Sequence, residues 1–408
     1  MALRTGLAAA FAAAMTILWA PLAGAQMSDN VVKIGVLNDR SGLYADLSGQ
    51  GSVIAAQMAI EAYGAAAKGM KVEAIGADHQ NKPDIGSNIA RQWLDIDKVD
   101  VIVDVPNSGV ALAVNEIVRE KNKVYLNSGA GTSDLTGKAC SPNTVHWTYD
   151  TWALANGTGK AVVQSGGDTW FFIVADYAFG QTLERETSAV VTANGGKVLG
   201  SVRHPLSTAD FSSYLLQAQS SKAKVIGLAN AGTDLTNSIK QAGEFGIVQG
   251  GQNLAGLLVF ITDVHGIGLQ AAQGLVLTEA FYWDLNDGTR AWSKRFAERN
   301  GGKYPTMIHA GVYSAVLHYL KAVEALKSDA DGAKVVAEMK RTPTDDPLLG
   351  KGTIREDGRK IHDMFLFQVK KPAESKAPYD YYTLRATIPA AEAFRPLDQG
   401  NCPLVKKG

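Results

Sequence analysis

The chain has 408 residues with 40 basic and 40 acidic side chains, so its formal net charge is zero and its length suggests two domains. No run of lysine or arginine stands out, which argues against nucleic acid and anionic membranes as partners. No later stretch is long and apolar enough to predict a membrane span.

The first residues have the pattern of a secretory signal peptide. Arg4 precedes an apolar, alanine-rich stretch at 7–22, and Ala23-Gly24-Ala25 forms a small-x-small cleavage site. An N-terminal anchor helix is the alternative, but Pro21 and the short apolar run argue against it. We expect residues 1–25 to be removed and the protein to be periplasmic.

The next stretch, 31–51, predicts a strand, a polar loop and a helix. Residues 31–37 form a nearly continuous apolar run, typical of a strand covered on both faces. Turn-forming and hydrogen-bonding residues follow at 38–48, and apolar residues recur at helical spacing over 54–62. In open α/β sheets, ligands bind at the carboxyl ends of strands, so this loop is either one wall of a site or a solvated connection.

The same strand–loop–helix unit then repeats along the chain. Further strands are expected at 70–75, 99–105 and 124–126, with helices at 89–96 and 111–120 between them. A second series begins with a helix at 152–164, followed by strands at 169–175, 197–202, 225–228, 254–261 and 275–278, with helices at 181–193 and 211–219 and one ending at 245. Helices at 289–300 and 308–326 and a strand at 362–369 complete the pattern, and the tail from 372 on is predicted to be irregular. Two βα-repeat domains follow from this order.

Enzyme motifs are missing from the sequence. It contains no GxxxxGK[ST] phosphate loop, no GxSxG nucleophile elbow and no HExxH zinc helix. The seven histidines are scattered without a pair at metal-ligand spacing. We therefore expect no catalysis, no metal and no cofactor.

The only two cysteines, Cys140 and Cys402, both lie in turn-like sequence. In an exported protein, a single pair is typical of a disulfide, although two inert thiols are the alternative. A Cys140–Cys402 disulfide would attach the irregular tail to the first domain.

Several segments together resemble the periplasmic substrate-binding proteins of the branched-chain amino acid type, which serve ABC importers. The resemblance depends on IGVLNDRSGLYADLSGQG, YLNSGAGTSDLT, VADYAFGQ, and IKQAGEFG with the following LLVFITD. It implies an α/β type I periplasmic-binding fold, with two Rossmann-like lobes that have parallel-sheet cores and are joined by three crossover segments. It also implies a monomer that closes on a small carboxylate and delivers it to permease subunits in the inner membrane.

The alternation of the two series predicts the lobe boundaries. Lobe 1 takes 26–149 and 283–350, lobe 2 takes 150–282 and 351–385, and residues 386–408 form a C-terminal tail. The chain is expected to cross between lobes near Tyr149–Asp150, Tyr282–Trp283 and Gly350–Thr353.

The resemblance also implies which residues form the binding site. They are Tyr44, Asn107, Ser108, Ser128, Ala130, Gly131, Thr132, Tyr177, Phe179, Asn230, Asp263, Tyr282 and Trp283. Asn230 and Ala231 stand where the family often has another aromatic residue, so that wall is changed. Two further aromatic residues near the first crossing, Tyr149 and Trp152, are expected to face the ligand.

Three of these residues have a structural alternative. Tyr282 and Trp283 could be core or hinge residues, and Asp263 could cap a helix. A cleft-facing Asp263 would pair with an ammonium group and favour an amino acid, whereas a capping Asp263 would favour an aromatic acid such as benzoate.

Two other functions remain open at this point. A secreted α/β hydrolase would need a nucleophile and a base facing the crevice. A sensor domain would present its ligand to a signalling partner instead of a permease.

Overall fold

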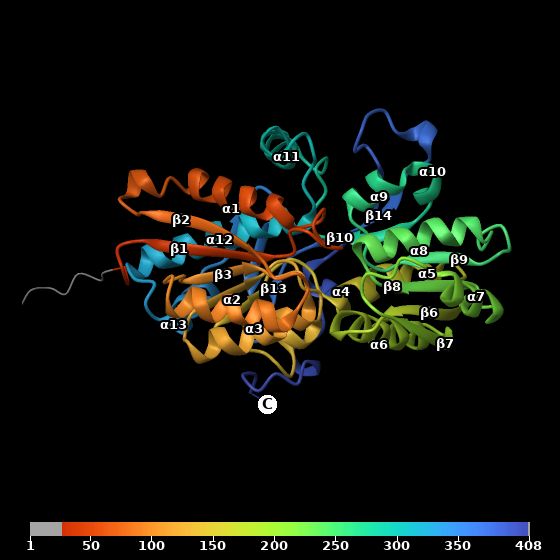
Figure 1. The fold of residues 1–408 in the computed structure, drawn as a ribbon, viewed down its shortest axis with the longest axis horizontal. Helices are drawn as coiled ribbons and strands as arrows, with labels where there is room; N and C mark the ends of the chain where they lie inside the picture. The colour runs from red at the N-terminus through yellow and green to blue at the C-terminus, as the bar shows by residue number, and fades with distance from the viewer. Residues whose placement is uncertain (1–26, 407–408) are drawn as a thin grey trace, which may run out of the picture.

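The computed structural model describes residues 27–406, which fold into two lobes placed side by side (Figure 1). The signal peptide expected at 1–25 lies outside the described residues. No helix within 27–406 combines the length and the apolar character needed to cross a bilayer.

Lobe 1 is built on a five-stranded, all-parallel sheet of order β2-β1-β3-β4-β5. Its strands are β1 (Val32–Asn38), β2 (Val72–Asp78), β3 (Val101–Asp104), β4 (Val124–Asn127) and β5 (Thr144–His146). Its helices are α1 (Gly49–Tyr63), α2 (Pro83–Asp95), α3 (Ser108–Glu120), α11 (Asp287–Arg299), α12 (Met307–Leu326) and α13 (Gly332–Arg341).

Helices cover both faces of this sheet. In β3, Val101 and Val103 pack into the core that includes α1 and α12, while Ile102 between them packs into the core with α2 and α3. Successive side chains of a strand point to opposite faces, so both faces need apolar residues. This is why β1 and β3 are continuous apolar runs in the sequence.

Lobe 2 has a four-stranded parallel sheet of order β7-β6-β8-β9 and an antiparallel sheet of order β10-β14-β15. Its strands are β6 (Thr169–Ala175), β7 (Lys197–His204), β8 (Val225–Ala229), β9 (Asn253–Gly256), β10 (Val276–Glu279), β14 (Met364–Val369) and β15 (Tyr382–Ile388). Its helices are α4 (Thr151–Leu154), α5 (Lys160–Gln164), α6 (Ala178–Ala193), α7 (Ser212–Ser220), α8 (Gly232–Glu244), α9 (Ile261–Ile267) and α10 (Leu269–Ala272). Short helical turns complete the description: η1 (Ala66–Lys68), η2 (Ser133–Thr136), η3 (Ala155–Gly159), η4 (Pro372–Glu374) and η5 (Leu397–Gln399).

Two parts of this lobe differ from the expectation. The helix expected at 152–164 is interrupted by the π-helical turn η3, where Gly157 lies so close to Thr278 that a Cβ atom would be 2.3 Å from its hydroxyl. The tail from 372 on is not irregular throughout, because β15 pairs with β14 over Tyr382–Ile388 and α14 (Ala390–Ala393) follows. Most of β15 is exposed, so its sequence lacks the apolar run that marked the central strands.

The third chain crossing lies close to the end of the chain. Strand β12 (Gly350–Ile354) pairs with β11 (Thr344–Asp346) and β13 (Lys360–Ile361) in a small antiparallel sheet. The chain then passes from β13 to β14 at 362–363. The third crossing was expected earlier, near Gly350–Thr353, which is the start of β12. After β15 the tail returns to lobe 1, where Cys402 is bonded to Cys140, as expected.

Candidate functional site

A small pocket lies between the lobes, at the carboxyl ends of the strands of both parallel sheets. Its lining residues are Tyr44, Leu47, Pro106, Gly129, Gly131, Tyr149, Tyr177, Phe179, Ala231, Leu258 and Phe260. The lobes enclose it closely, and its cavity volume is only about 10 Å³. None of the lining side chains is charged, so an ionic ligand would have no ion-pair partner on the pocket wall.

Five of the residues expected to bind the ligand line this pocket: Tyr44, Gly131, Tyr149, Tyr177 and Phe179. The hydroxyl groups of Tyr44, in lobe 1, and Tyr177, in lobe 2, are hydrogen-bonded to each other across the gap. Tyr149 donates to the carbonyl of Gly129. Burial raises the pKa of all three hydroxyl groups, so they remain protonated donors at neutral pH.

Helix N-termini surround the pocket on both lobes. Tyr177, Ala231 and Phe260 are the N-cap residues of α6, α8 and α9. Leu47 and Pro106 directly precede the N-caps of α1 and α3. Each helix start carries the positive end of its dipole. The site therefore favours an anion without using a cationic side chain.

The loop after β3 is held in a strained conformation beside the pocket. Asp104 and Val105 have φ angles of 79° and 56°, which non-glycine residues rarely adopt. The Asp104 carboxylate accepts hydrogen bonds from Ser48 at 2.8 Å and Asn38 at 3.1 Å, and burial raises its pKa to about 6. A Cβ atom on Gly129 would lie 2.5 Å from that carboxylate, so only glycine fits there.

Four expected residues in this region support the pocket from behind. Asn107 caps α3 by accepting from the backbone N–H groups of Gly109 and Val110, and the hydroxyl of Ser108 accepts from the N–H of Thr132. The Thr132 hydroxyl lies 3.2 Å from that of Thr182 in lobe 2. Ser128 is also buried, and its hydroxyl has no hydrogen-bond partner among the described residues. These side chains order the loops of lobe 1 rather than line the pocket.

The remaining expected residues also lie outside the pocket lining. Ala130 donates its N–H to Asn127, Asn230 lies 3.2 Å from the His204 ring, and Trp152 is on α4. Tyr282 is buried in the lobe 2 core, and Trp283 packs against its edge. Both donate a side-chain hydrogen bond to the carbonyl of Tyr379. Tyr282 and Trp283 are therefore packing residues, the alternative to ligand contact considered for them above.

Asp263 caps a helix. Its carboxylate accepts a hydrogen bond of 2.9 Å from the N–H of Phe260, the residue before α9, and it does not line the pocket. Burial raises its pKa to about 7. The pocket thus has no acidic side chain that would pair with a ligand ammonium group.

The buried Asp263 predicts a pH effect on stability. Its pKa in the folded protein, about 7, lies above the value near 3.9 of an unfolded chain. The stabilising proton is therefore present below the unfolded pKa and is lost as the pH rises through the folded pKa. Asparagine keeps the acceptor for Phe260 and removes the charge. We therefore expect the unfolding free energy of Asp263→Asn, measured relative to wild type, to increase by roughly 1–3 kcal/mol when the pH is raised from 5 to 8.

Urea denaturation at both pH values measures this difference. The exposed Asp345→Asn is the matched control and should show no such trend. A pH dependence of Asp263→Asn identical to that of wild type would contradict the assignment.

Six lining residues lie outside the expected set: Leu47, Pro106, Gly129, Ala231, Leu258 and Phe260. The expected strand at 254–261 conceals two of them, because β9 ends at Gly256 and the apolar residues after it form a loop. Pro106 and Leu47 each precede a helix N-cap, a signal that could have located them.

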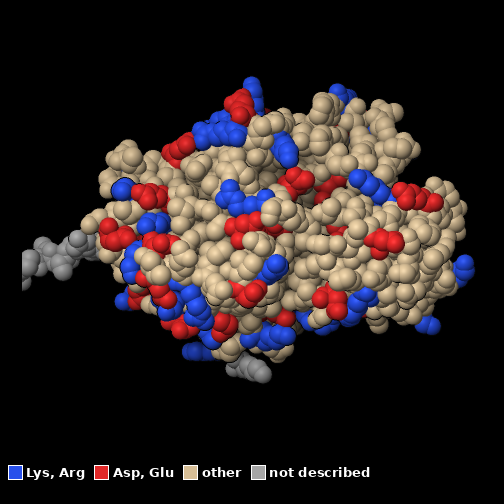
Figure 2. Space-filling view, viewed as in Figure 1, with Lys and Arg blue, Asp and Glu red and all other residues tan. Residues whose placement is uncertain are grey.

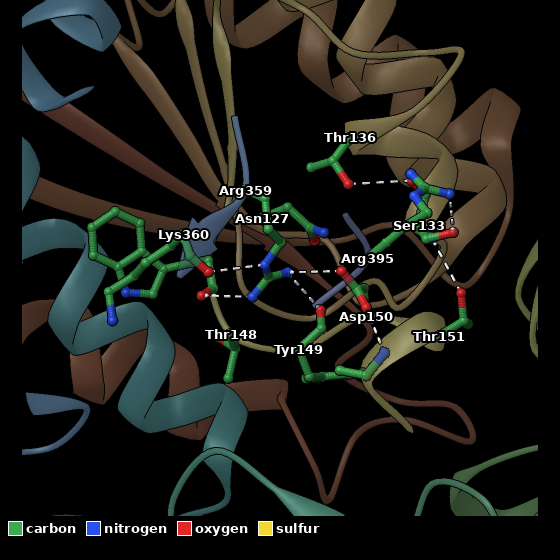
Figure 3. A network of polar contacts seen from close by, with 12 residues as sticks. Asn127, Ser133, Thr136, Thr148, Tyr149, Asp150, Thr151, Arg359, Lys360 and Arg395 are labelled. Atoms are coloured by element: carbon green, nitrogen blue, oxygen red, sulfur yellow. Dashed lines mark hydrogen bonds and ion pairs between the residues drawn. The ribbon is translucent and has the colours of Figure 1, made fainter. Parts of the chain in front are cut away.

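The crossing beside the pocket is held by a buried arginine (Figure 3). Arg359 is fully buried and donates to the carbonyls of Trp147 at 3.0 Å and Tyr149 at 3.1 Å. Its guanidinium also lies 3.6 Å from the carboxylate of Asp150. Nε2 of His362 lies 2.8 Å from the carbonyl of Thr148. Arg359 and His362 of the third crossing therefore contact the carbonyls of three successive residues, 147–149, in the first crossing.

Comparison with known proteins agrees with this geometry. A periplasmic binding protein family matches residues 31–376. A crystal structure of a periplasmic binding protein from Burkholderia mallei is 53% identical, with a TM-score of 0.90, and the match covers 93% of this chain and 100% of that one. A branched-chain amino acid ABC transporter periplasmic ligand-binding protein from Burkholderia xenovorans is 42% identical, with a TM-score of 0.81, over 91% of this chain and 99% of its own. A Leu/Ile/Val-binding protein homologue from Brucella melitensis is 26% identical over 86% of this chain and 90% of its own length. The chain belongs to the periplasmic binding protein family.

Proposed function

We propose that this protein captures a small aromatic carboxylate between its lobes and delivers it to the permease of an ABC importer. The observation that carries the proposal is the pocket itself, which has aromatic walls, five adjacent helix N-termini and no charged lining side chain. The helix starts favour the carboxylate. The rings of Tyr149, Phe179 and Phe260 offer flat apolar contact to the body of the ligand.

An amino acid ligand is the second candidate, because the Burkholderia xenovorans relative is described as belonging to a branched-chain amino acid transporter. An ammonium group buried in this pocket would lack an acidic partner, which costs several kcal/mol. Asp263, the acid expected to supply the charge, is used as a helix cap. The aromatic acid is therefore the better fit.

Catalysis fits less well. The lining contains no serine, cysteine or histidine, so a hydrolase would lack its nucleophile and base there. A sensor would share this pocket, and a direct assay of uptake with the cognate permease would separate a sensor from a transport protein.

Acidic and basic side chains are interspersed on the face shown in Figure 2, which supports a small-molecule partner rather than nucleic acid.

Calorimetry with benzoate, 4-hydroxybenzoate, leucine and phenylalanine tests the ligand class. We expect at least one aromatic acid to bind at least about tenfold more tightly than either amino acid. Phe179→Ala should weaken that binding by about tenfold or more, because it removes a ring from the pocket wall. Phe171→Ala is the matched control, since Phe171 lies on β6 of the same lobe but outside the pocket.

The Asp263→Asn variant separates the two ligand classes. Under the aromatic acid proposal it leaves ligand affinity unchanged, whereas loss of a salt bridge to an amino acid would weaken binding by more than about tenfold. Tight binding of leucine with none of the aromatic acids bound would refute the proposal.

A further inference from the structure

A second and larger cavity opens in lobe 2, at the amino ends of its strands and thus opposite the interlobe pocket. We define this groove by the first residues of β8, β9 and β10 together with parts of α5, α8 and α10. It lies between the parallel sheet and the antiparallel sheet of the lobe. The edge strands β9 and β10 of these two sheets are not hydrogen-bonded to each other, which leaves room for the groove. Its volume of about 850 Å³ falls within the range of about 300–1,000 Å³ typical of small-molecule sites.

Aliphatic side chains form one part of the groove lining, and polar side chains such as Asn253, Gln270 and Gln273 form another. The aliphatic residues are Val162, Val225, Ile239, Val248, Leu254, Leu275, Val276 and Leu366. Val225 and Ile239 are buried, whereas Val248 is 50% exposed, so the apolar surface extends from the core to solvent. The aliphatic part of this surface can bury a flexible alkyl chain, while its polar residues can face a polar head group.

The charged residues of the groove have one sign. Lys240 and Arg385 are its only charged lining residues, and neither takes part in an ion pair among the described residues. The guanidinium of Arg385 donates to the neutral side-chain amide of Gln368 on the neighbouring strand, which leaves its charge uncompensated. No aspartate or glutamate lines the groove. Charge complementarity therefore selects an anionic head group.

We infer that this groove binds a single-chain amphiphile with one carboxylate head, such as a fatty acid. The alkyl chain packs on the aliphatic floor, and the carboxylate lies against Arg385 and Lys240 at the rim. This site is separate from the interlobe pocket, since the two share no residue.

Calorimetry with dodecanoate tests the inference on the full protein. We expect saturable binding of one dodecanoate per chain. Gly243→Phe should abolish it or weaken it at least about tenfold, because Gly243 lines the groove and has open space around the position of a Cβ atom. Gly243 is inside α8 with an ordinary helical φ, so the substitution is compatible with folding.

Two variants serve as matched controls. Gly266→Phe fills open space beside another helical glycine, on α9 and outside the groove, and should leave dodecanoate binding unchanged. Tyr177→Ala alters the interlobe pocket and should also leave it unchanged. Arg385→Gln should weaken binding about two- to fivefold, the range of an exposed ion pair. The neutral amphiphile dodecyl maltoside should bind at least about twofold more weakly than dodecanoate.

Three results would overturn the inference. In the first, dodecanoate does not saturate a single site, and in the second it binds Gly243→Phe as tightly as wild type. In the third case binding is lost in Tyr177→Ala but kept in Gly243→Phe, which would place the amphiphile in the interlobe pocket.

Discussion

Replacement of Arg359 by methionine is expected to lower the free energy of unfolding by about 3–5 kcal/mol. The guanidinium is fully buried, and its loss leaves Asp150 and the carbonyls of Trp147 and Tyr149 without their partner. Uncompensated buried charge and unmade hydrogen bonds are the costly terms, whereas methionine fills much of the same volume. Urea denaturation with wild type measured in parallel gives the difference.

The control for this substitution is Arg341→Met. Arg341 forms an ion pair with Glu338 on the surface of α13, and its side chain is 74% exposed. Exposed pairs contribute about 0–1 kcal/mol, so this variant should be close to wild type. An equal, small effect of both substitutions would show that the crossing is not held by Arg359.

Removal of the disulfide is expected to cost about 2–5 kcal/mol of unfolding free energy. The bond joins residues 262 positions apart, so its absence allows the unfolded chain far more conformations. The double variant Cys140→Ala/Cys402→Ala avoids leaving one reactive thiol. Its denaturation midpoint should fall relative to wild type by the corresponding amount.

Thiol titration of unfolded, unreduced wild type, expressed in the periplasm, is the companion measurement. No free thiol is expected there. Two free thiols, or a double variant as stable as wild type, would contradict the prediction.

The sequence predicted the central strands well because buried parallel strands leave a direct signal. Strands β1 and β3 are apolar on both faces, and the polar loops that follow them mark the carboxyl edge where the pocket forms. Tyr44, in the loop after β1, and Tyr177 and Phe179, after β6, were predicted from the resemblance to periplasmic substrate-binding proteins, and all three line the pocket. Strand β15 was missed, since much of it is exposed and carries no apolar run.

Residues whose role depends on tertiary contacts could not be predicted from the sequence alone. No motif around Asp263 indicates whether its carboxylate caps a helix or contacts a ligand. Only the 2.9 Å hydrogen bond from the N–H of Phe260 decides between these roles. Phe260 lies in an apolar run that continues β9, so nothing in the sequence marks the end of the strand at Gly256. The positive φ angles of Asp104 and Val105 likewise have no signal in the sequence, and Ser48 and Asn38, which bond the Asp104 carboxylate, are distant in sequence.

The position of Cys402 sets the order in which this protein can mature. Cys140 leaves the ribosome long before Cys402, because the two residues are 262 positions apart. Lobe 1 must therefore keep a single thiol until the chain has been made as far as Cys402. Oxidation of this pair is then possible only after the 262 positions between the two cysteines have been made, and a chain truncated before Cys402 would expose Cys140 to mispairing with other thiols.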